Sequence, residues 1–151
     1  MTLNDIIYVL ITSMLPVIEI RGALPLALAL DIPTALAFIL CVIGNMIPIP
    51  FLILLTRKIL SWMKTLKVFR PIAEKIEAKG LKNSKGAQKI SFWGLLILVA
   101  IPLPGTGAWT GALVASLLNM RLKDSLPAIF VGVCIAGLIV LLVSLGIIHL
   151  L

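Results

Sequence analysis

Two charged side chains stand inside the first apolar stretch of the chain, and they are the residues best suited to chemistry. Thirteen uncharged residues separate Asp5 from Glu19, and nine separate Arg21 from Asp31. A charge at the bilayer centre costs about 2.5–3.5 kcal/mol on insertion scales, so such charges usually have a function and a partner. Arg21 offers a planar fork that can hold a phosphate or carboxylate, and Glu19 offers a carboxylate that can exchange a proton. The alternative is a static ion pair between the two.

A second candidate region carries no charge but frees backbone groups. Its prolines and glycines interrupt any helix, because proline lacks the N–H and clashes with the preceding turn. Free N–H groups at the start of a half-helix attract anions, whereas free carbonyls suit cations. The candidate binding residues here follow a break at Pro102 and are Pro104, Gly105, Thr106, Gly107 and Thr110. Gly107 also begins a four-residue spacing of small residues, with Gly111 and Ala115, that permits close helix packing.

Asn45 is the remaining candidate for a binding site. It follows Gly44 and precedes Pro48 in an uncharged stretch. A lone Asn there either hydrogen-bonds across helices or lines a cavity, and the sequence leaves both open. The chain has one His and two Cys, and nothing in it resembles a nucleophile–base arrangement or a metal-binding cluster. We therefore expect no enzymatic activity, no metal and no cofactor.

The composition indicates that these residues lie in a membrane. The 151 residues are 61% hydrophobic and 13% charged, whereas soluble domains are about 45–50% apolar and about 25% charged. Residues 32–56 and 125–151 carry no charged side chain. Because one crossing needs about 20 apolar residues, each of these stretches is predicted to form one transmembrane helix.

Two other apolar stretches are too long for one crossing and are broken near their middles. As one helix, residues 3–30 would be about 42 Å long and residues 90–118 equally long, against a hydrocarbon core of about 30 Å. The breaks in the first stretch are Pro16, Gly22 and Pro25. We predict that both stretches fold as re-entrant hairpins, which survive at membrane depth only where protein buries them or a watery cavity solvates them. Glu19 and Arg21 are expected on non-helical backbone, where residues i and i+2 share a face.

The basic residues give the orientation. Ten of the 13 Lys and Arg residues fall within residues 57–89, which places this segment in the cytoplasm by the positive-inside rule. With two hairpins, both termini lie outside and every basic residue except Arg21 is cytoplasmic. Four plain crossings would instead put Arg121 and Lys123 outside. We therefore expect a multi-pass protein of the inner (plasma) membrane.

The basic segment has an expected structure of its own. Residues 57–70 place apolar side chains at helical spacing and predict an amphipathic helix in the headgroup plane. Pro71 and Gly80 can begin and end a second short helix, and residues 82–89 are expected to be flexible. Its charge fits either contact with anionic lipid or a simple topology signal. Nothing in it indicates nucleic-acid binding.

These elements together predict an all-α integral membrane protein with two re-entrant helical hairpins and two full transmembrane helices. Residues 1–151 form one membrane domain, divided into repeat one (3–56), the cytoplasmic amphipathic helical loop (57–89) and repeat two (90–149). The two full helices run in opposite directions, so the halves are expected to be inverted repeats. That architecture puts binding sites near the bilayer midplane, between discontinuous helices.

The two broken stretches resemble a known family. PVIEIRGALPLALAL (16–30) and IPLPGTGAWTGALVASLL (101–118) resemble the small multi-drug export proteins, a family that is similar to the DedA/VTT membrane proteins. The resemblance implies paired re-entrant hairpins and the movement of phospholipids or polyprenyl-phosphate carriers, dependent on the proton-motive force. Where the second DedA hairpin usually has Arg two residues after Pro-Gly, this chain has Gly107. An anion there would be held by backbone, Thr hydroxyls or Arg21.

The resulting expectation is a membrane transporter or flippase that is proton-coupled through Glu19. Its substrate is expected to be amphipathic, such as an anionic lipid phosphate anchored by Arg21. The alternatives are an exporter of cationic amphiphilic drugs and a non-transporting membrane scaffold. The expected partners are membrane lipids, protons, the substrate and further copies of the chain. We expect a homo-oligomer because so short a chain would need a second copy to enclose a cavity.

Overall fold

The computed structural model describes residues 2–65, 85–103 and 105–150, and all regular structure in these ranges is helical. The expectation of an all-α protein is confirmed for this part of the chain. The helices are α1 (Leu3–Met14), α2 (Glu19–Ala29), α3 (Thr34–Met46), α4 (Pro48–Thr65), α6 (Lys85–Ala100), α7 (Ala108–Leu117) and α8 (Leu122–Leu150).

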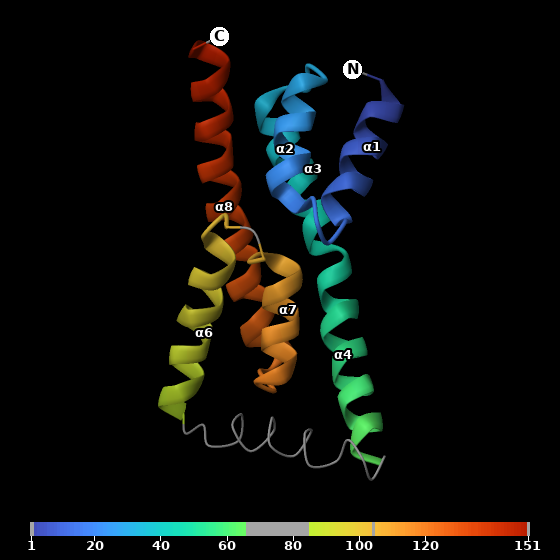
Figure 1. Cartoon of the computed structure of the whole chain (residues 1–151), viewed down its shortest axis with the longest axis vertical. Helices are drawn as coiled ribbons and strands as arrows, with labels where there is room; N and C mark the ends of the chain where they lie inside the picture. The colour runs from blue at the N-terminus through green and yellow to red at the C-terminus, as the bar shows by residue number, and fades with distance from the viewer. Residues whose placement is uncertain (1, 66–84, 104, 151) are drawn as a thin grey trace.

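The first 30 residues form a helical hairpin. Thr2 and Asp5 make a reciprocal capping box, in which each side chain accepts from the other's backbone N–H, and this starts α1. In Figure 1, α1 runs from the end of the molecule that holds the N-terminus to its middle, and α2 returns to the same end. The hairpin turns between Met14 and Glu19, at the proline predicted to break the helix, Pro16.

A long apolar helix follows the hairpin. α3 and α4 run in nearly the same direction from one end of the molecule to the other (Figure 1). The two are separated at Ile47, where Pro48 cannot donate a hydrogen bond to the preceding turn. Together they give 29 residues, Thr34–Trp62, long and apolar enough to cross a membrane. Close approach of α1 to α3 depends on Gly44, since a Cβ there would overlap the Ser13 hydroxyl and lie 2.7 Å from the Leu10 carbonyl oxygen.

The second half of the chain shows the same order of elements. α6 runs from the opposite end of the molecule to its middle and α7 turns back, and α8 then runs the full length to the C-terminus (Figure 1). Within α8, the 25 residues Leu122–Gly146 are long and apolar enough for a second crossing. The turns of the two hairpins meet near the middle of the long axis, where the contacts of Glu19 and Arg21 with the second turn join them.

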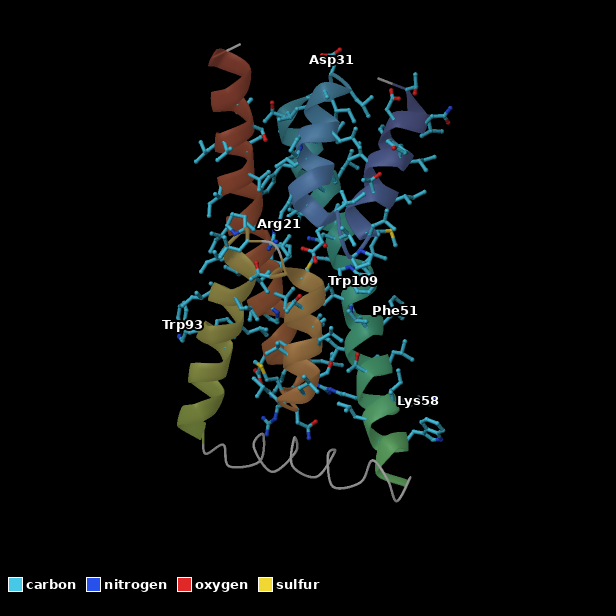
Figure 2. The ribbon with its side chains drawn as sticks, viewed as in Figure 1. Arg21, Asp31, Phe51, Lys58, Trp93 and Trp109 are labelled. Carbon is cyan, nitrogen blue, oxygen red and sulfur yellow. The ribbon has the colours of Figure 1, made fainter. Side chains whose placement is uncertain are left out.

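The packing fits an apolar environment. Small residues are buried in the second helix of each hairpin, with Ala23, Ala27, Ala108 and Ala112 fully buried. Large apolar side chains instead cover the outside, such as Phe51, which is 72% exposed and points away from the bundle in Figure 2. Such an apolar exterior is unfavourable in water and suited to lipid.

Three local expectations differ from the structure. Residues 19–29 are helical, not extended, because Pro25 is accommodated inside α2. Residues 57–65 are helical as predicted, but they continue α4 instead of forming a separate helix; the Arg57 guanidinium donates to the Met120 carbonyl through Nη2, and its Nε has no partner among the described residues. Residues 85–89 belong to α6 and are not an irregular stretch. The remainder of the expected amphipathic helix and the short helix from Pro71 lie outside the described residues. The re-entrant placement, the inverted repeat and the topology remain predictions.

Candidate functional site

Glu19 is the first residue of α2 and points to the start of α7. Its backbone has φ +49°, a conformation that non-glycine residues rarely adopt. The side chain is only 4% exposed, and Oε1 accepts a hydrogen bond of 3.1 Å from the backbone N–H of Trp109. α7 has no side-chain cap within its own segment. Glu19 therefore supplies the cap from the other hairpin, and its negative charge complements the positive end of the α7 dipole.

Gly107 makes room for this carboxylate. A Cβ at Gly107 would overlap Glu19 Oε2 and lie 2.8 Å from Cδ. Its φ of +126° is also one that side chains disfavour. The residue is thus required both by the backbone turn and by the approach of Glu19. Gly111, one turn further along α7, has the packing role expected for it, because a Cβ there would lie 2.6 Å from the Val99 side chain.

Arg21 contacts the other side of the same break, as Figure 2 shows near the middle of the molecule. Its Nη1 donates to the Leu103 carbonyl, and its Nη2 donates to the Ile101 carbonyl at 3.3 Å and to Thr106 Oγ1 at 2.8 Å. Ile101 directly follows α6, so the guanidinium lies at the negative end of the α6 dipole.

The two charges of the first hairpin therefore act on the two free helix ends of the second. The carboxylate of Glu19 binds the N-terminal end of α7, and the guanidinium of Arg21 binds carbonyls that follow the C-terminal end of α6. Their hydrogen bonds cross to the other hairpin instead of joining the two residues to each other. Each charge thus satisfies backbone groups that a broken helix would otherwise leave free inside an apolar bundle.

The remaining residues of the second turn mostly satisfy one another. Thr106 Oγ1 lies 2.7 Å from the Ile101 carbonyl oxygen and 2.8 Å from that of Leu103, and it donates to one of them. The Thr110 hydroxyl donates to the Gly105 carbonyl at 3.0 Å, and Gly105 has φ +84°. Both hydroxyls are thus engaged in shaping the turn. Pro104 lies outside the described residues.

Asn45 is brought to this site from α3. It is fully buried, and neither Oδ1 nor Nδ2 has a hydrogen-bond partner among the described residues. With Glu19, Gly107 and residues of α8 it lines a narrow space between the two hairpin turns. Of the two interpretations of Asn45, the cross-helix hydrogen bond is not formed in this structure.

Trp109 is a site residue that the sequence did not single out. Its indole Nε1 donates to the Met14 carbonyl at 3.1 Å, at the end of α1, while its backbone N–H donates to Glu19. Figure 2 shows Trp109 beside the first hairpin turn. The signal available in the sequence was an indole donor two residues after Gly107, since a buried Trp N–H usually finds a partner.

The expected break residues occupy different places. Pro16 lies in the first turn as predicted, whereas Gly22 lies inside α2 and does not break it. A Cβ at Gly22 would lie 2.5 Å from the Ile18 side chain. Pro25 and Pro102 line a larger cavity beside Arg21. The structure therefore brings Glu19, Arg21, Asn45 and Gly107 together around the narrow space, and Arg21 also lines the larger cavity.

A family model described as "Putative small multi-drug export protein" matches residues 19–139. The match begins at Glu19 and includes the second turn and most of both long apolar helices. No curated protein and no solved structure matches the chain, and the likeness to DedA/VTT proteins stays a prediction. The description of the family is that of an exporter and not of an enzyme. Because the match covers well over half of the chain, this membrane protein belongs to the small multi-drug export protein family.

Proposed function

We propose that the protein exports small amphipathic molecules across the membrane, and that its two hairpins are re-entrant and meet at the bilayer midplane. Family membership supports the export activity. The joint of the two hairpin turns, formed by Glu19 and Arg21, is the observation that carries the architectural part of the proposal.

Helix lengths support the re-entrant arrangement. α1 has 12 residues, α2 has 11 and α7 has 10, which correspond to about 15–18 Å at 1.5 Å per residue. These helices reach about half of a hydrocarbon core of about 30 Å. The fourth arm, α6, has 16 residues and is longer, at about 24 Å, because it begins inside the basic segment. The α3–α4 pair and α8 have the length for a full crossing. Each half of the chain would then contribute one hairpin and one crossing, and the two halves would be inverted repeats.

The joint gives the proposed exporter a defined point of contact between its halves. In inverted-repeat transporters, access alternates when one repeat rocks or opens against the other around a site near the midplane. Here the Glu19–Trp109 hydrogen bond and the Arg21–Thr106 hydrogen bond connect the repeats at that level. We propose that these hydrogen bonds hold the two repeats in a closed arrangement, and that they break and form again during transport.

An efflux assay tests this function. Cells lacking their own major pumps are loaded with lipophilic dyes, and dye loss is compared between the wild type, Glu19→Gln and the control Asp124→Asn. Asp124 is an acidic residue in the first turn of α8. We expect the wild type and Asp124→Asn to export dye and Glu19→Gln to export it at least tenfold more slowly. Equal dye retention in wild-type cells and in cells without the protein would refute export.

Proton coupling and the class of substrate are part of the same proposal, and each has its own measurement. Proton coupling through Glu19 predicts that efflux stops when the proton gradient is collapsed, at unchanged protein level. Movement of an anionic lipid phosphate predicts that a labelled lipid changes leaflet in vesicles containing the purified protein. An exporter restricted to cationic drugs predicts inhibition by quaternary ammonium compounds. If Glu19→Gln and Arg21→Ala both insert and transport like the wild type, these residues have no role in coupling or binding.

A further inference from the structure

A cavity of about 600 Å³ lies beside the joint, between α2 and the C-terminal half of α8. Its size falls within the range of about 300–1,000 Å³ that is typical of small-molecule sites. Its lining residues are Arg21, Pro25, Ala29, Pro102, Ile139, Val140, Val143 and Ser144. In Figure 1, α2 and this part of α8 extend from the middle of the molecule towards the end that holds the termini. The cavity therefore begins at the joint and runs along the upper half of the bundle.

The cavity has apolar walls and a charged inner end. Pro25, Ala29, Ile139 and Val143 offer no hydrogen-bonding side chain, so the walls select an apolar body. Among the described lining residues, Arg21 is the one that carries a charge. From Arg21 to Ala29 the helix rises about 12 Å at 1.5 Å per residue. A ligand of that length would have one end at the guanidinium and the other near Ser144.

The charge of Arg21 is not neutralised by its own hydrogen bonds. Its known acceptors are two carbonyls and the Thr106 hydroxyl, which are all uncharged, and Nε has no partner in the described part of the chain. The Glu19 carboxylate interacts electrostatically with Arg21, but it is directed at the positive end of α7 and lines the narrow space instead of the cavity. In a medium of low dielectric constant, a charge at this position acts strongly on anything in the cavity. The inner end therefore attracts an anion and repels a cation.

We propose that this cavity binds small amphipathic anions, with the acidic group at Arg21 and the apolar body between α2 and α8. Lipophilic weak acids in their ionised form have this chemistry, and so does the phosphate end of an anionic lipid. Taking the ligand as the transported substrate rests on the proposed export function, whereas binding itself does not. Through Pro102, a bound ligand would also contact the second hairpin turn, next to Ile101, whose carbonyl accepts a hydrogen bond from Arg21. A ligand in the cavity would therefore contact both halves of the molecule.

A matched pair of probes tests the charge preference. Tetraphenylborate and tetraphenylphosphonium have nearly the same size and shape and opposite charges. Their binding to the purified full-length protein in neutral detergent is measured by calorimetry, with empty micelles as the reference for partitioning. We expect tetraphenylborate to bind at least tenfold more tightly than tetraphenylphosphonium. Equal affinity, or tighter binding of the cation, would overturn the proposal.

Cavity-filling variants test the location without touching the joint. Ala29→Phe and Val143→Trp each place an aromatic ring in the cavity and leave every contact of Arg21 with the second turn in place. Both should weaken tetraphenylborate binding at least tenfold, whereas Arg21→Gln should remove the charge preference if the variant folds. Unchanged binding in both cavity-filling variants would refute this site. Val131→Phe, on an exposed part of α8 away from the lining, is the control and should bind like the wild type.

Two further comparisons complete the test. One distinguishes the sources of the anion, and the other distinguishes the proposed binding site from the proposed export function. Displacement of tetraphenylborate by an anionic phospholipid, but not by a lipophilic carboxylate, would identify a lipid headgroup as the ligand, and the reverse result would identify a small weak acid. Binding without efflux would refute the export function and leave the site standing. Efflux that the cavity-filling variants do not alter would refute this site as the substrate site and leave the export function standing.

Discussion

Replacement of Gly107 by alanine is the sharpest perturbation of the joint. The new Cβ would overlap Glu19 Oε2 and would require φ +126° of a residue with a side chain. Backbone strain of this kind costs about 1–3 kcal/mol, and loss of a hydrogen bond to a charged group costs about 1.5–3 kcal/mol. We therefore expect Gly107→Ala to lower the free energy of unfolding by about 2.5–6 kcal/mol, the sum of these two terms.

Two other glycines separate the cost of backbone strain from the cost of the overlap with Glu19. Gly105 also has positive φ, at +84°, but a Cβ there would meet nothing within 4 Å. Gly105→Ala should therefore cost only the strain, about 1–3 kcal/mol. Gly94 has ample space and no positive φ, and it lies in α6, so Gly94→Ala should be neutral or stabilising by up to about 1 kcal/mol.

The assay is reversible unfolding of the purified variants in mixed detergent, followed by tryptophan fluorescence. Each variant is measured in the wild-type background and in the Glu19→Ala background. If the overlap with the carboxylate causes the excess cost, Gly107→Ala should become no more harmful than Gly105→Ala once Glu19 is shortened. An equal cost for Gly107→Ala and Gly105→Ala in the wild-type background would refute the reasoning.

The remaining predictions concern buried polar groups, packing and capping. Asn45→Leu should raise the free energy of unfolding by about 1–3 kcal/mol, because it removes an unsatisfied buried amide. A lowered stability would contradict the structure. A loss of efflux in the same variant would show that the amide serves transport. Gly44→Ala should cost about 1–3 kcal/mol through overpacking against α1, whereas Gly146→Ala, which has nothing within 4 Å of a Cβ, should cost nothing measurable by thermal unfolding. The pKa of Asp5 is held below its usual value by hydrogen bonds from Thr2, so the capping box is intact at neutral pH and above. Its contribution should be lost as the pH falls through that lowered pKa, visible as faster amide exchange in the first turn of α1; exchange that does not change with pH would contradict it.

The sequence predicted the positions of the breaks because proline and glycine act locally. Helices end before Pro16 and before Pro102, and the next helix begins after Gly107, while the two uncharged stretches do form the long helices. The helical state of residues 19–29 does not follow from the local pattern, because a proline inside a helix normally disrupts it, yet α2 contains Pro25. The continuity of the first long helix past Arg57 to Thr65 also differs from the expected separate helix, and the contact of Arg57 with Met120 joins residues far apart in sequence.

The functions of the two charges could be found only in part from the sequence. Their types and their place in an apolar stretch indicated a functional pair in one location. What each binds depends on residues more than 80 positions away, such as Leu103 for Arg21 and Trp109 for Glu19. No local spacing encodes such contacts. The cavity likewise combines α2 with α8, and its volume depends on how these helices pack.

Topology in intact cells tests the central claim, two hairpins that enter the membrane from opposite sides and meet at the joint. Cys41 and Cys134 are replaced by alanine, and single cysteines are introduced at four exposed positions, Asn4, Thr34, Ser61 and Lys123. A membrane-impermeant maleimide is then added from outside. The account predicts labelling at Asn4 and Thr34 and none at Ser61 and Lys123 until the cells are opened. Labelling of Lys123 from outside together with protection of Asn4 would mean four plain crossings and would contradict the account.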